Sequence, residues 1–108
     1  MSNDKLDVVS SFKTMSLELA KIKEALTIDD IALSSAKYSD FKEKISTLKL
    51  SLEGKKLNSY QRNFLLPAVS EILSSSLIAN KGSRNKTNIG RSVSDADDYV
   101  AYWLSELE

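Results

Sequence analysis

The chain has 108 residues, of which 42% are hydrophobic and 28% are charged, with 15 basic and 15 acidic side chains. These values are typical of one soluble globular domain, which we take as residues 1–108, and the zero net charge removes any overall attraction to nucleic acid or to an anionic membrane. Cysteine and histidine are both absent, which excludes disulfides, thiolate metal sites and the commonest general base of enzymes.

The sequence contains no recognisable targeting or membrane-spanning segment. Its first residues, M-S-N-D-K-L-D, lack a basic region followed by an apolar run, so we expect no secretory signal. Its apolar runs are all shorter than the roughly 18 residues of a membrane span. We therefore expect a cytoplasmic protein that stays out of the membrane.

Residues 4–26 predict the first helix, with Asn3 or Asp4 as its cap. Apolar residues recur there at steps of four and three, which places them on one stripe of a helix. That main stripe consists of Val8, Phe12, Met15, Leu19, Ile22 and Leu26. A weaker stripe on another side leaves self-association into a homo-oligomer open. It consists of Leu6, Val9, Leu17 and Ala20.

Thr27 opens the stretch T-I-D-D, which resembles a capping box for a second helix. Either one helix spans residues 28–53 or the chain breaks near Ser39. We favour one helix, because the apolar stripe keeps its phase through this region, with Ser34 at the step that would complete it. Gly54 is expected to end the helix, because glycine can turn left-handed at no steric cost. The stripe consists of Ile31, Tyr38, Phe41, Ile45, Leu48 and Leu52.

Asn58 or Ser59 is expected to cap the third helix, which runs to about Asn80. Within it, residues 65–79 are apolar on most sides, which indicates a buried helix at the centre of the fold. Pro67 lacks an N–H and clashes with the carbonyl four residues back, so we expect a kink there.

Residues 81–92 contain two glycines and no acidic residue, and we predict a long irregular loop. Ser92 or Ser94 then caps a short last helix. The acidic residues Asp95, Asp97 and Asp98 would occupy its first turns, where they suit the helix dipole.

Together these elements predict an all-α fold, namely a small antiparallel four-helix bundle with a long basic loop before a short last helix. The short first and second connections favour antiparallel neighbours. Because the last helix is short, part of the bundle would lack a fourth wall, and the loop, a second copy or a partner would cover it.

The loop supplies one candidate site, for an anion or a nucleic acid. Backbone amides near Gly82 and Gly90 and four cations would engage phosphates. The alternative is a solvated loop whose charges balance nearby acids such as Asp29 and Asp30. The cations of this candidate site are Lys81, Arg84, Lys86 and Arg91.

A second candidate site, for a protein partner, rests on aromatic and basic residues. Trp103 is expected to face the core, since it shares a side with Val100 and Leu107, whereas Tyr102 is expected to be exposed. A second basic and aromatic group lies near Lys55 and Lys56. The candidate partner-binding residues are Tyr102, Tyr99, Tyr60 and Arg62.

Catalytic patterns are missing from the sequence, including a G-x-S-x-G elbow. We expect no metal site, because helix N-termini attract acids such as Asp95, Asp97 and Asp98 without a metal, and we expect no cofactor. The sequence therefore favours a small non-catalytic protein-binding module, such as an adaptor, inhibitor or assembly subunit. The alternative is a nucleic-acid-binding accessory protein that uses the basic loop.

Overall fold

The computed structural model describes residues 3–79 and 86–107, apart from the side chains of residues 75–79. Within these ranges the chain forms four α-helices and one π-helical turn, and it contains no strand. The predicted all-α class is therefore confirmed. The elements are α1 (Asp4–Thr27), α2 (Ile31–Glu53), the π-helical turn η1 (Gln61–Leu65), α3 (Leu66–Ala79) and α4 (Lys86–Leu107).

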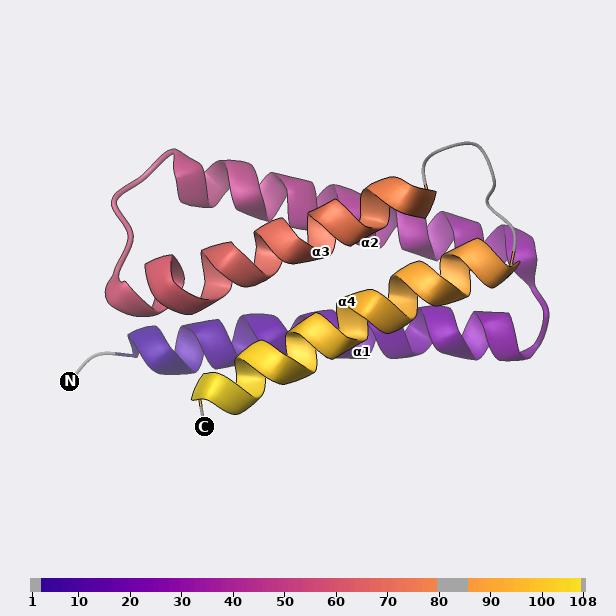
Figure 1. Ribbon diagram of the computed structural model, residues 1–108, viewed down its shortest axis with the longest axis horizontal. Helices are drawn as coiled ribbons and strands as arrows, with labels where there is room; N and C mark the ends of the chain where they lie inside the picture. Colours follow the sequence, from indigo (N-terminus) through magenta and orange to yellow (C-terminus); the bar gives the residue numbers. More distant parts are fainter. Residues whose placement is uncertain (1–2, 80–85, 108) are drawn as a thin grey trace.

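The helices form a bundle in which the chain reverses direction from each helix to the next (Figure 1). Each helix packs against its two neighbours in the order α1, α2, α3, α4, and α4 completes the ring by packing against α1. The molecule measures 46 × 24 × 17 Å along its principal axes. The end of α2, the turn η1 and the beginning of α1 lie at one end of the long axis. The connection from α1 to α2 and the beginning of α4 lie at the other (Figure 1).

The apolar stripes of the first two helices form the core, as their spacing predicts. All six members of the main α1 stripe are buried, and Ser34 completes the α2 stripe as a fully buried residue. Its hydroxyl donates to the carbonyl of Asp30 at 2.7 Å, which satisfies the polar group inside the core. The largest fully buried side chains are those of Tyr38, Phe12, Phe41, Leu19, Ile22, Leu52, Ile72 and Ile89.

Residues 31–53 form one helix, without a break near Ser39, but Thr27 does not cap it. Thr27 is the last residue of α1, and its hydroxyl donates to the carbonyl of Lys23 at 2.9 Å. The cap is Asp30, whose carboxylate accepts from the N–H of Leu33 at 3.0 Å. A carboxylate is a better cap than a threonine, and Asp30 stands directly before the helix.

The two ends of α2 differ from the sequence prediction in their backbone angles. Gly54 ends the helix, but its φ is −90°, so it does not use the left-handed region. The left-handed residue is Asp29, with φ at 58°, in the connection from α1 to α2. Aspartate is among the few residues with a side chain that adopt this conformation readily.

The third helical segment begins at Asn58 and changes its winding before Pro67. Asn58 and Gln61 form a reciprocal cap: the side chain of each accepts from the backbone N–H of the other, at 2.8 and 3.1 Å. In η1 the N–H of Leu66 donates to the carbonyl of Gln61, five residues back. The irregularity expected at Pro67 therefore takes the form of a widened turn directly before the proline, which has no N–H to continue the α-helical pattern.

Helix α3 is one wall of the bundle and is not enclosed on all sides. It packs between α2 and α4. Ala68, Val69 and Ile72 are buried, whereas Ser74 is exposed. Its buried side therefore belongs to the core, as its apolar sequence predicts, while Ser74 reaches solvent on the other side.

The last helix is longer than predicted, and this is the main correction to the sequence interpretation. It begins at Lys86, so residues 86–92 are helical and neither Ser92 nor Ser94 is its cap. Ser92 is buried within the helix beside Ile89 and Val93, which belong to the core. With 22 residues against 23 in α2, α4 forms a complete fourth wall.

Three ion pairs join α1, or its connection to α2, to a neighbouring helix. Lys44 of α2 binds Glu18 of α1 at 2.9 Å, Lys23 of α1 binds Asp97 of α4, and Lys86 binds Asp29. All three are at least partly exposed to solvent, which screens the charges, so they contribute little to stability. The hydrogen bond and the charge of Glu18 raise the pKa of Lys44 above its usual 10.5. This contribution is therefore present at neutral pH and is lost only as the pH rises through that raised value.

Candidate partner-binding surface

Four aromatic side chains from η1, its preceding residue and α4 form a continuous cluster. The rings of Tyr60 and Phe64 stack with their centroids 6.1 Å apart. Phe64 meets Trp103 edge to face at 6.2 Å, and Trp103 meets Tyr102 in the same way at 5.2 Å. We call Tyr60, Phe64, Trp103 and Tyr102 the aromatic cluster. Ring pairs of this kind each contribute about 0.5–1.5 kcal/mol beyond the area they bury.

The inner part of the aromatic cluster is joined to the core, and its outer end reaches solvent. Tyr60, Phe64 and Trp103 are partly buried and pack against the core residues. Tyr102 is 56% exposed. The Nε1 atom of Trp103 is buried, and it is the one buried side-chain nitrogen or oxygen in the described part of the chain that has no hydrogen-bond partner. Tyr102 is therefore an exposed ring that packs against the ring of Trp103.

Tyr102 lies on a face of α4 that also carries carboxylates. Residues three, four and seven apart share one side of a helix, so Asp95, Asp98, Tyr99 and Glu106 lie on the same side as Tyr102. Asp98 and Glu106 are exposed, and Asp95 and Tyr99 are partly exposed. None of the three carboxylates forms an ion pair with another described residue. We call Asp95, Asp98, Tyr99, Tyr102 and Glu106 the acidic–aromatic face.

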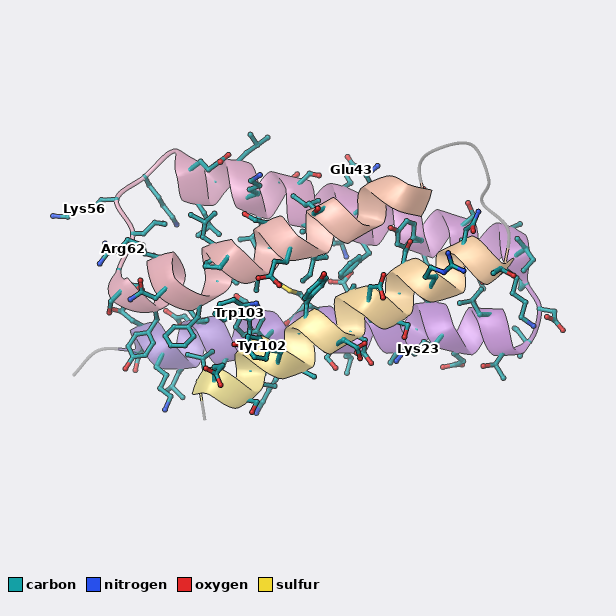
Figure 2. The ribbon with its side chains drawn as sticks, in the orientation of Figure 1. Lys23, Glu43, Lys56, Arg62, Tyr102 and Trp103 are labelled. Carbon is teal, nitrogen blue, oxygen red and sulfur yellow. The ribbon has the colours of Figure 1, made fainter. Side chains whose placement is uncertain are left out.

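The structure brings together most of the residues that the sequence marked as partner-binding. Tyr60 and Tyr102 belong to one aromatic cluster, although more than forty residues separate them, and Tyr99 belongs to the acidic–aromatic face. Figure 2 shows Arg62 near Lys56 at the end of the bundle where α2 is joined to η1. The guanidinium of Arg62 donates to the carbonyl of Leu57 in a long hydrogen bond of 3.5 Å.

Sequence reasoning did not single out Phe64, which links Tyr60 to Trp103. Its spacing of four from Tyr60 was the signal that could have found it, since such residues are neighbours on a helix. The contact with Trp103 depends on the packing of α3 and η1 against α4, which is a tertiary feature.

The residues of the candidate anion site do not form one basic loop. Lys81 and Arg84 lie outside the described residues. Lys86 is the first residue of α4 and is paired with Asp29. Arg91 is exposed on α4, four residues before Asp95. The pairing of Lys86 fits the interpretation in which these cations balance nearby acids.

Other kinds of site find little support in the part of the chain that the structure describes. It contains no group of three or more acidic side chains placed to hold a metal ion. Asp97 is paired with Lys23, and all three aspartates lie well inside α4 rather than at its beginning. None of the described helices is both long and apolar enough to cross a membrane.

Comparison with known proteins gives no relative for this chain: no family model, no curated protein and no solved structure matches it. The fold and surface define an all-α bundle with an acidic–aromatic face, and its function has to be inferred from that surface.

Proposed function

We propose that this protein is a non-catalytic protein-binding module, an adaptor, inhibitor or assembly subunit, that contacts its partner through the acidic–aromatic face of α4. The observation that carries the proposal is the exposed ring of Tyr102, which stands among three carboxylates that form no ion pair with any other described residue. A cytoplasmic location remains part of the proposal.

The bracing of Tyr102 favours binding, because an interface gains more from a side chain that is already fixed. Its contact with Trp103 restricts the ring before any partner arrives, so less conformational entropy is lost on association. Tyrosine and tryptophan are also the residue types most enriched among binding hot spots.

The charges around Tyr102 indicate the chemistry of the partner. A lysine or arginine on the partner would stack on the ring and meet Asp98 or Glu106, which lie one turn before and one turn after it. Such a partner presents at least one cationic side chain among apolar ones. The complementarity would speed association and orient the complex more than it would add affinity.

The nucleic-acid alternative has weaker support. Of its four cations, Lys86 is paired with Asp29, and Arg91 shares its helix with the carboxylates of the acidic–aromatic face. Those carboxylates would repel phosphates that approach α4.

Site-specific photo-crosslinking in cells tests the proposal. A photoreactive phenylalanine analogue is placed at position 102, and the control carries it at position 50, where Leu50 is 71% exposed on α2. We expect a discrete crosslinked protein from position 102 that is absent from position 50. It should disappear when Asp98 and Glu106 are changed to lysine.

Equal crosslinking from both positions would contradict the proposal, and so would crosslinks that survive the charge reversal. A gel-shift titration with DNA and RNA at two salt concentrations tests the alternative. Tight binding that weakens steeply with salt and is lost when Lys81, Arg84, Lys86 and Arg91 become alanine would favour the nucleic-acid function.

A further inference from the structure

The outer side of α1 exposes apolar side chains that no other described helix covers. Leu6 is 66% exposed and Leu17 is 63% exposed, and Ala20 is also exposed. Between the two leucines the helix surface is hollowed, with Val9, Ser10, Lys13 and Thr14 lining the hollow. This surface lies away from the core stripe of α1 and is separate from the acidic–aromatic face of α4.

The spacing of this surface is that of a helix that packs against another helix. Lys13, Leu17, Ala20 and Glu24 follow one another at steps of four, three and four, the spacing of a seam between paired helices. We call these four residues the outer seam. Its centre contains one large and one small apolar residue, Leu17 and Ala20, which complement each other in size.

The ends of the outer seam carry opposite charges that lack ion pairs. Neither Lys13 nor Glu24 pairs with another described residue. They are eleven helical steps apart, roughly 16 Å along the axis, so they cannot pair within one chain. A seam with a cation at one end and an anion at the other is complementary to its own antiparallel copy.

We propose that two copies of this chain associate through the outer seam of α1, antiparallel about a two-fold axis between Leu17 and Ala20. In this arrangement Leu17 packs on Ala20 of the second copy. Lys13 faces Glu24 of the second copy, and this pair occurs twice by symmetry. Val9 lies opposite Ile28 of the second copy, whose side chain is 67% exposed. A parallel pairing would instead place Lys13 against Lys13, which the charges oppose.

One helix face makes a small interface. We therefore expect a weak, concentration-dependent dimer rather than an obligate one. The dimer leaves the acidic–aromatic face free, so it does not depend on the proposed function.

Sedimentation equilibrium over a range of protein concentrations tests the dimer, with charge reversal as the decisive comparison. Lys13→Glu and Glu24→Lys should each raise the dissociation constant roughly tenfold or more, because each creates two like-charge pairs. The double variant Lys13→Glu/Glu24→Lys should restore the wild-type constant, because it swaps both members of each pair. Since the two positions cannot meet within one chain, this rescue requires a second copy.

Leu17→Glu should abolish the dimer, and Leu50→Glu is the matched control because Leu50 is a similarly exposed leucine on α2. Circular dichroism checks that each variant keeps its helices. A wild-type protein that stays monomeric at millimolar concentration would overturn the proposal. So would a double variant as weak as the single ones, or a dimer that survives Leu17→Glu.

Discussion

Gly90 lies inside α4, where its flexible backbone weakens the helix. A methyl group added there would meet no atom within 4 Å, so nothing prevents the change to alanine. We expect Gly90→Ala to raise the free energy of unfolding by about 0.5–1 kcal/mol, because alanine loses less backbone entropy in a helix.

Urea denaturation followed by circular dichroism measures this effect. The reverse change in the same helix, at the exposed residue Ala101, is the control and should lower stability by about the same amount. A destabilising Gly90→Ala would mean that the chain around Gly90 is not helical.

Asp29 has a left-handed backbone and also forms an ion pair with Lys86. Two substitutions distinguish the contribution of the backbone conformation from that of the charge. Asp29→Ala should cost about 1 kcal/mol or more, because alanine loses the charge and also tolerates the left-handed region poorly. Asp29→Asn should cost less, since asparagine adopts this conformation readily and only an exposed pair is lost. Thermal unfolding of the two variants distinguishes them, and equal losses would show that the charge alone matters.

The entry into η1 depends on the reciprocal cap of Asn58 and Gln61, since these hydrogen bonds satisfy the first free N–H groups of the segment. Asn58→Ala should lower the free energy of unfolding by about 1 kcal/mol. The neighbouring Ser59 is exposed and serves as the control, with a cost near zero for Ser59→Ala.

A double-mutant cycle with Gln61→Ala tests whether the cap is reciprocal. Each change removes one of the two hydrogen bonds and loosens the turn that holds the other, so the two losses should be less than additive. Strict additivity would show that each side chain acts alone.

At the level of elements, the sequence predicted the helices whose stripes are long and regular. The stripes of α1 and α2 span their whole lengths, so both the existence and the phase of these helices follow from periodicity. The beginning of α4 was predicted to be part of a loop, because this stretch contains Gly90 and no acidic residue. Burial of Ile89 and Val93 against the other helices outweighs that local preference, and a single sequence does not reveal such packing.

The candidate surface was predictable to the extent that it lies on one helix. Trp103 shares a side of α4 with Val100 and Leu107, and this placed Tyr102 on the outside. The contact of Phe64 with Trp103, which joins Tyr60 to the cluster, required the packing of η1 against α4, and periodicity does not encode that packing.

For the whole molecule, stability depends on one core shared by four helices. A cavity anywhere in this core therefore lowers the free energy of unfolding of the whole domain. Phe12 is fully buried, and Phe12→Ala should cost about 3–5 kcal/mol, a large part of the stability of a domain this size. Ile72→Ala should cost about 2–5 kcal/mol. Leu48 and Trp103 are only partly buried, so we expect changing either to alanine to cost about 2 kcal/mol, the lower end of the range for Ile72→Ala.

Guanidinium denaturation measures these losses, with Tyr102→Ala as the comparison. Tyr102 is largely exposed, and we expect its truncation to cost far less than that of Trp103. If Tyr102→Ala destabilised the protein as much as Trp103→Ala, the ring of Tyr102 would be part of the core rather than a free surface.

Trp103 is the only tryptophan of the chain, and its buried indole N–H has no hydrogen-bond partner among the described residues. An indole shielded from water emits at shorter wavelengths than a hydrated one, because fewer solvent dipoles relax around its excited state. The protein therefore carries an intrinsic fluorescent probe in direct contact with Tyr102. Its emission will report, without any label, both the separation of α4 from η1 and the arrival of another molecule at the neighbouring ring.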